Sequence, residues 1–536
     1  MRISTMIPSG AVAIASLIYL TRIPALASPT PESPFVPSET VARQNAFQIF
    51  NTVHSALRQW GSSLNHNGMS VFVVTVPEGN LLYHGDYRPD PPPGPEWLAF
   101  EVEHAELFAR PRRRAPPGRR PPPDPVGYHL DPRPQVPFGF DGEDYLDFDE
   151  RLHGAVEEDQ PGGYLHVYRA TAPLRLLYID GMGAAKTNMG TLDTQDLLLR
   201  RANASTPMDE RRRAAELCAL ATSWGLDGVV RMEAGFEVIK CDFSTGLALA
   251  SAPRRASSDA SGRGPSAVRM LEYMRAVGQR YHGLGRDRAR IDWDAAVSAW
   301  WYPVNTTNPD PDGAAAGLPR LVGTTDAALD AMRARVGEVV AASLGRDGGG
   351  GAGGGFDWQG VVDAIVARYA DKLRYMGEKA ESLGVMQAEV NNLLDIFIDY
   401  VGEEPDLAAA ARNCAAHYLS AAQPASPEDR AIWAALEEVS RAVCSELFRV
   451  RRLVVEDPGA DEQSLGEAMD VVRALMRRLG WTRWRDCPSC PSNEVCFVAM
   501  WPYGDTASHV QPGCRNSTSI QMRWEDSYWR RFSPSL

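Results

Sequence analysis

Beyond position 27 the chain has no long apolar run. No later segment approaches the roughly 18 consecutive apolar residues that a membrane-spanning helix needs. Basic residues are also in deficit, because 55 lysines and arginines face 68 aspartates and glutamates, for a net charge of −13. Nucleic acid binding needs a basic surface. The sequence therefore predicts no membrane span after the leader and no nucleic acid partner.

A complete nucleotide-binding motif is missing as well. Leu176 to Thr187 reads LLYIDGMGAAKT, an apolar strand followed by a glycine loop and Lys-Thr. A phosphate-binding loop of the type G-x-x-x-x-G-K-[ST] surrounds phosphate with backbone N–H groups. Here Asp180 and Ala185 occupy the two glycine positions, and a carboxylate at the first would repel phosphate. We predict no nucleotide and no cofactor.

Two common catalytic motifs are absent too. The chain contains no G-x-S-x-G nucleophile elbow. The stretch Phe100 to Phe108, FEVEHAELF, places His104 among Glu101, Glu103 and Glu106 and resembles a fragment of a metal site. No second histidine follows four residues later, as a zinc protease helix requires. We interpret the stretch as a solvated or salt-bridged patch and predict no metal site.

Lysine is scarce, with only four in the chain against 51 arginines, which indicates a coding bias. Lys186 is nevertheless retained in the glycine loop. Together with Asp180, Gly181 and Gly183 it could form the rim of a polar ligand-binding pocket. The alternative is that the glycines only build a turn.

The N-terminal segment 1–27 has the pattern of a secretory signal peptide. Arg2 supplies positive charge, Ala11 to Leu20 forms a short apolar core, and Ala25-Leu26-Ala27 is a cleavage pattern. The mature protein would begin near Ser28. We therefore expect a secreted, extracellular protein.

Eight cysteines, an even number, fit a disulfide framework in such a protein. Cys414 and Cys444 lie on two helix-like segments, so a disulfide between them would join a helical hairpin, and Cys218 would then pair with Cys241. The pairing of the four C-terminal cysteines stays open: Cys487, Cys490, Cys496 and Cys514. Three sequons predict glycosylation at Asn203, Asn305 and Asn516.

The pattern of the chain predicts an α+β fold. An antiparallel, strand-rich N-terminal domain with helices would precede a mainly α-helical C-terminal half and a disulfide-rich tail. The predicted segments are a signal peptide 1–27, a linker 28–40, an α+β domain 41–250 with a disordered Pro/Arg insertion at 109–137, a linker 251–266, a helix-rich connecting region 267–345, a Gly-rich linker 346–356, a helical bundle 357–480 and a cysteine-rich tail 481–536.

Three pairs of strand-like segments carry short connections that suit antiparallel hairpins. These pairs are Met69 to Val76 with Leu81 to His84, Tyr164 to Ala170 with Leu174 to Ile179, and Val229 to Glu233 with Phe236 to Phe243.

Carboxylates at the third of these hairpins are candidates for catalysis. Glu233 and Glu237 lie on either side of Ala234-Gly235, and a hairpin end can offer the spacing of about 5 to 9 Å that glycoside hydrolysis uses. Asp180 is a third candidate. Acidic residues also occur at ordinary turns, so a purely structural role is the alternative.

Four stretches of the sequence resemble a family of uncharacterised proteins from filamentous ascomycete fungi. They are Pro91 to Arg110, Gly163 to Leu199, Trp224 to Phe243 and Glu494 to Gly504. The resemblance implies a fungal secretory context. It implies no activity and no catalytic residue.

The leading hypothesis is a secreted, glycosylated, disulfide-stabilised protein that binds an extracellular ligand or a cell-wall component. The pocket would be assembled from Gly163 to Thr187 and Glu233 to Asp242. The alternatives are an extracellular carboxylate-dependent hydrolase of the glycoside hydrolase kind, and a structural or effector-like interaction protein. Whether it is an enzyme is left open, and a concave, partly buried cluster of the candidate carboxylates would favour one.

Overall fold

The computed structural model describes residues 36–110, 163–202, 210–255, 267–280, 283–285, 287–309, 317–346, 356–401, 405–520 and 526–532. Several predicted features lie outside these ranges. They are the signal peptide, most of the Pro/Arg insertion, most of the linkers 251–266 and 346–356, and the sequon Asn203.

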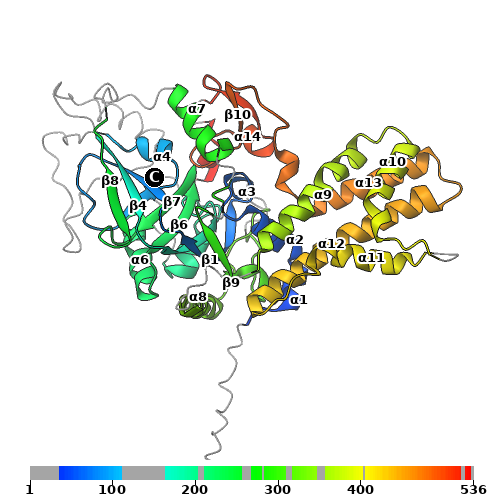
Figure 1. The fold of residues 1–536 in the computed structure, drawn as a ribbon, viewed down its shortest axis with the longest axis horizontal. Helices are drawn as coiled ribbons and strands as arrows, with labels where there is room; N and C mark the ends of the chain where they lie inside the picture. Colours follow the sequence, from blue (N-terminus) through cyan, green and yellow to red (C-terminus); the bar gives the residue numbers. More distant parts are fainter. Residues whose placement is uncertain are drawn as a thin grey trace, which may run out of the picture.

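Nine strands of the described residues form one curled sheet in the order β8-β4-β2-β3-β7-β6-β5-β1-β9 (Figure 1). Neighbouring strands run antiparallel except β5 and β6, which are parallel. Their bounds are β1 Asn67–Val76, β2 Leu81–Asp86, β3 Glu96–Ala99, β4 Tyr164–Ala170, β5 Leu174–Gly181, β6 Gly228–Glu233, β7 Gly235–Lys240, β8 Leu247–Ser251 and β9 Arg290–Ser298.

Only the third of the predicted hairpins forms. β6 and β7 pair around their short turn, with Arg231 opposite Glu237. The other two predictions are wrong, because β1 pairs with β5 and β9, while β2 pairs with β3 and β4. The short connections β1–β2 and β4–β5 instead link strands that are not neighbours in the sheet. In the first, Gly79 donates its N–H to the Ala170 carbonyl, and in the second, Thr171 donates its N–H to the Gly246 carbonyl.

Helices cover the sheet on several sides (Figure 1). α4 contacts β2 and β3, α6 contacts β6 and β7, and α8 packs on β9. These and the other helices before the bundle are α1 Glu39–Gln44, α2 Ala46–Ser55, α3 Gln59–Leu64, α4 Val102–Glu106, a π-helix Thr194–Leu199, α6 Glu210–Ser223, α7 Ala267–Arg275 with a π-helical end Ala276–Arg280, a 3₁₀-helix Ala299–Trp301, and α8 Asp326–Arg346.

The C-terminal half is a helical bundle, as predicted, so the α+β class is confirmed. Its long helix α12 begins with an N-cap at Ser426 and Pro427 in the first turn, and it packs against α1 and α2 from the other end of the chain. A disulfide joins Cys414 of α11 to Cys444 of α12. The bundle helices are α9 Trp358–Glu378, α10 Leu383–Leu394, α11 Leu407–Ala416, α12 Pro427–Arg451 and α13 Glu462–Leu479.

The cysteine-rich tail forms a small two-stranded sheet with one α-helix and two 3₁₀-helices, and it lies beside α7 (Figure 1). Its elements are a 3₁₀-helix Thr482–Arg485, β10 Glu494–Phe497, α14 Thr506–Val510, β11 Gly513–Asn516 and a 3₁₀-helix Tyr528–Phe532. Disulfides join Cys487 to Cys496 and Cys490 to Cys514, and Cys218 pairs with Cys241. All eight cysteines of the chain are therefore paired.

Within the described ranges, no helix has both the length and the apolar character needed to cross a membrane.

Candidate functional site

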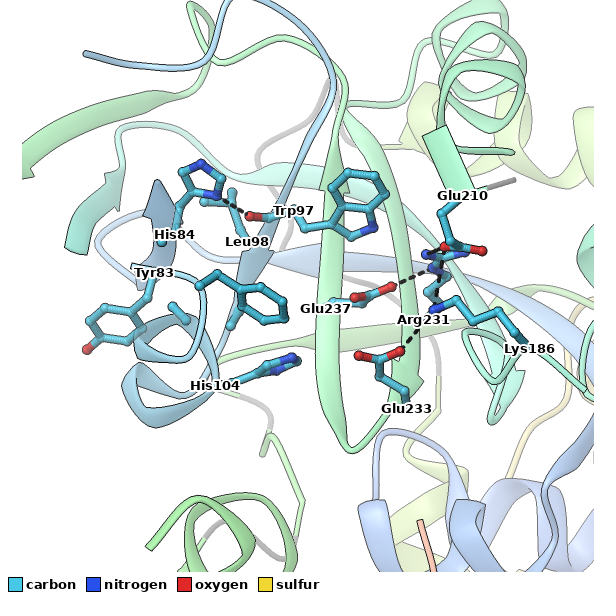
Figure 2. A pocket seen from close by; sticks show the side chains of 14 residues that line it. Tyr83, His84, Trp97, Leu98, His104, Lys186, Glu210, Arg231, Glu233 and Glu237 are labelled. Atoms are coloured by element: carbon cyan, nitrogen blue, oxygen red, sulfur yellow. Dashed lines mark hydrogen bonds and ion pairs between the residues drawn. The ribbon is translucent and has the colours of Figure 1, made fainter. Parts of the chain in front are cut away.

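A small cavity lies against the sheet where β2, β3, β6 and β7 meet α4 and the start of α6 (Figure 2). Its volume is about 30 Å³. The charged residues that line it are Lys186, Glu210, Arg231, Glu233 and Glu237, beside the imidazole of His104. Aromatic side chains, among them Trp97 and Phe108, form other parts of the wall.

The alternation of side chains along β6 and β7 explains why three charged residues share this cavity. Successive strand residues point to opposite faces, so Arg231 and Glu233 lie on one face while Val230 and Met232 lie on the other. Glu237 is directly opposite Arg231 on β7 and joins the same face. The turn between the strands requires Gly235, whose φ of +97° favours glycine.

Ion pairs hold the charged side chains in place. Arg231 donates from Nε to Oε1 of Glu237 at 2.6 Å and from Nη2 to Oε2 of Glu210. Lys186 donates from Nζ to Oε2 of Glu233 at 3.0 Å and lies 3.7 Å from Oε2 of Glu210. Each of these five residues is at most 7% exposed. Arg213, which is 1% exposed, also pairs with Glu210, so the three carboxylates face three buried cations, and Arg213 is shared with Asp196.

Burial and neighbouring charges shift the protonation of this cluster. Burial raises the pKa of Glu233 to about 7, although Lys186 acts in the opposite direction. Burial also raises the pKa of Glu210, but Arg231 and Lys186 outweigh that effect and hold the pKa well below its usual value. Of these two carboxylates, Glu233 therefore takes up a proton more readily.

His104 contributes a further polar group to the wall of the cavity. It lies on α4 and is 3% exposed. A Cβ at Gly235 would lie 2.8 Å from its Nδ1, so the ring sits against the β6–β7 turn. Burial, with some help from Lys186, lowers the pKa of His104 to about 4. Its Nδ1 is buried without a hydrogen-bond partner.

His104, Glu233 and Glu237 are close enough to share a ligand. One nitrogen of the imidazole and one oxygen of each carboxylate lie within 4.8 Å of one another. Figure 2 shows the ring pointing toward the two carboxylates from the opposite wall of the cavity.

The C-terminal tail covers Lys186. The Nζ atom of Lys186 lies 4.5 Å from the centre of the Trp501 ring, a distance typical of a cation–π contact. Both side chains are buried, and Trp501 belongs to the segment that follows β10. The tail therefore forms part of the site's enclosure.

The structure brings some of the predicted site residues together and separates others. Glu233, Glu237 and Lys186 meet in the cavity. Asp180 lies on the opposite face of the sheet beside Tyr178, where burial raises its pKa to about 7. Gly181 has a φ of +68° and, with Gly183, builds the turn after β5, so neither lines the cavity.

Sequence reasoning missed Arg231 and Glu210, and it set His104 aside. Arg231 was detectable, because a charged residue within the buried strand GVVRME needs a partner. Glu210 and His104 come from separate helices, so their positions in the sequence gave no sign that they meet.

The two described sequons differ in exposure. Asn305 is exposed, and its Oδ1 accepts a hydrogen bond from the Thr307 N–H. Asn516 is half-buried at the end of β11, and its Oδ1 accepts from Thr518 and Ser519.

Comparison with known proteins links the chain to uncharacterised fungal proteins. Residues 36–272 match the family model described as the YPL277C N-terminal domain. The uncharacterised protein YOR389W of Saccharomyces cerevisiae is 25% identical over 562 aligned residues, which cover 88% of this chain and 84% of that protein. The uncharacterised protein YPL277C of the same yeast is 34% identical over 212 residues, 37% of this chain and 41% of that protein. No solved structure matches the chain.

Proposed function

We propose that this protein is a secreted hydrolase and that the cavity between α4, β6 and β7 is its active site. One observation carries the proposal: Glu233 and Glu237 face the same buried cavity together with Lys186 and Arg231. A buried network of charges contributes little to stability compared with apolar packing. Buried charge partners with a shifted pKa in a cavity are typical of functional sites.

The arrangement supplies the groups that hydrolysis needs. Hydrogen bonds from Arg231 and Lys186 fix one oxygen of each carboxylate. The other oxygen of either carboxylate can accept a proton from a water molecule as that water attacks the substrate. Positive charge on Lys186 and Arg231 would stabilise the negative charge that develops in the transition state. The proton would then pass to the leaving group.

We expect Glu233→Gln and Glu237→Gln each to lower the hydrolytic rate by about 100-fold or more. Both changes keep the shape of the side chain but remove the proton acceptor. The measurement is kcat/KM on a panel of ester, glycoside and polysaccharide substrates with the purified full-length protein.

Asp180→Asn is the matched control, because it neutralises a buried carboxylate on the opposite face of the same sheet. Rates for Glu233→Gln and Glu237→Gln equal to that of Asp180→Asn would contradict the proposal. Absence of turnover by the wild-type protein across the whole panel would also count against it.

The small volume of the cavity favours a second candidate, a binding protein without turnover. A space of about 30 Å³ holds a water molecule or an ion. A binding protein would show a ligand-dependent rise in melting temperature and no product.

Secretion is a separate part of the proposal and has its own test. The leader pattern of residues 1–27 and the pairing of all eight cysteines support it. On expression in a fungal host we expect the protein in the medium with Ser28 at its N-terminus, as read by N-terminal sequencing. Enzymatic removal of N-glycans should lower the mass, and Asn305→Gln should remove one glycan. An intact Met1 on protein found only inside the cell would refute secretion.

A further inference from the structure

We propose that His104, Glu233 and Glu237 bind a divalent transition-metal cation in the cavity. This inference deepens the proposed function by naming its cofactor, and the metal would polarise the attacking water. The three residues come from α4, the end of β6 and β7, and all are buried.

Each of the three residues has a donor atom to spare. Oε2 of Glu233 accepts from Lys186, and Oε1 of Glu237 accepts from Arg231. The second oxygen of each carboxylate accepts no hydrogen bond from the described residues. Nδ1 of His104, a residue only 3% exposed, likewise has no partner. A buried polar atom without a partner costs free energy, and a bound cation would remove that cost.

The distances allow a metal after an inward adjustment. One nitrogen of the imidazole and one oxygen of each carboxylate lie within 4.8 Å of one another. Two bonds of about 2.1 Å to zinc place their donors about 3.4 Å apart at the tetrahedral angle. Donors at the full 4.8 Å would therefore need to approach by about 1.4 Å, which a change of rotamer can give. Three protein ligands leave a fourth position for water, as in catalytic zinc sites.

Donor type selects the class of metal. Charge balance does not require one, because the cations Lys186, Arg213 and Arg231 face the three carboxylates Glu210, Glu233 and Glu237, and Arg213 is shared with Asp196. An imidazole nitrogen with two carboxylates suits Zn²⁺ or Mn²⁺, whereas Mg²⁺ and Ca²⁺ prefer oxygen ligands alone.

Lys186 and Arg231 each donate a hydrogen bond to one oxygen of a carboxylate ligand and so restrain its orientation. Metal sites commonly give this role to residues around the ligands. The positive charges of Lys186 and Arg231 also repel a cation, and we therefore expect weaker binding than in a site without them.

The test is calorimetric titration of the metal-free, full-length protein with ZnCl₂ and, separately, with MnCl₂. We expect one ion per chain for at least one of the two metals. His104→Gln and Glu237→Gln should weaken that binding by about 100-fold, by analogy with the loss of metal-supporting residues. Asp180→Asn is the matched control and should bind as the wild type does. Absence of binding by the wild type, or equal binding by His104→Gln and Asp180→Asn, overturns the inference.

Two measurements keep this inference separate from the proposed hydrolase activity. Thermal unfolding of the metal-free variants checks that they fold, and Glu237→Gln serves if His104→Gln does not. Tight metal binding without turnover on any substrate would support the metal site and reject the hydrolase. Turnover that survives chelation and His104→Gln would support the hydrolase and reject the metal site.

Discussion

Replacing Arg231 with methionine is expected to lower the free energy of unfolding by about 3–5 kcal/mol, the usual cost of removing one partner from a buried ion pair. Arg231 is fully buried on β6 and donates hydrogen bonds to Glu237, Glu210 and Gln195. Methionine fills a similar volume but donates no hydrogen bond. Glu210 would keep Arg213 and Lys186, whereas Glu237 would lose its ion pair.

Denaturant titration of the full-length protein measures this loss, and Arg212→Met on the same helix as Glu210 is the control. Arg212 is 68% exposed and pairs with Glu216 on the surface of α6, so its loss should cost about 0–1 kcal/mol. The double change Arg231→Met with Glu237→Gln should recover part of the loss, because it removes the carboxylate left unpaired. Equal destabilisation by Arg231→Met and Arg212→Met would show that the buried network contributes no more than a surface pair.

The sequence predicts local structure well here and long-range pairing poorly. The β6–β7 hairpin follows from two adjacent strand patterns around Ala234-Gly235, and the structure confirms it. Met69 to Val76 also reads as a strand, and the structure extends it to Asn67. Its partners, however, are β5 and β9, and both lie far along the chain, beyond the Pro/Arg insertion. A short turn signal after β1 gives no information on that choice.

The same limit applies to the candidate site. Glu233 and Glu237 were predictable because one hairpin carries both, and Lys186 because lysine is rare in this chain. His104 was set aside because no second histidine follows it in the sequence, yet the groups it meets belong to the β6–β7 hairpin. Asp180 was grouped with the glutamates, and the alternation of β5 places it on the other face of the sheet. Only the folded sheet decides which distant carboxylates meet.

Lowering the pH from 7.5 to 4.5 is expected to raise the free energy of unfolding of His66→Gln, relative to that of the wild type, by about 2–3 kcal/mol. His66 lies between α3 and β1 and is fully buried. Its Nδ1 lies 2.8 Å from Oδ1 of Asn67, and its Nε2 lies 3.0 Å from the Tyr528 hydroxyl, which suits a neutral ring that donates to Asn67 and accepts from Tyr528. Burial lowers its pKa from 6.5 to about 4.

The sign follows from the protons bound in each state. Above pH 6.5 the imidazole is neutral in the folded and the unfolded protein, so it adds no pH dependence. Between pH 6.5 and about pH 4 the unfolded chain binds a proton that folded His66 refuses, so stability falls as pH falls. His509, whose ring centre lies 5.3 Å away, adds to the trend, because burial with His66 and Arg485 lowers its pKa to about 3.

Buried carboxyls act in the opposite direction, so the pH profile of the wild type alone is a poor test. Burial raises the pKa of Asp180 to about 7, and this group gains stability as pH falls. The difference in unfolding free energy between His66→Gln and the wild type cancels that contribution. At pH 7.5 the variant His66→Gln should be less stable than the wild type, because glutamine packs less well than the ring. At pH 4.5 the stability of the variant relative to the wild type should be higher by about 2–3 kcal/mol than at pH 7.5. A difference that does not change with pH for His66→Gln would mean that folded His66 accepts a proton as readily as the unfolded chain does.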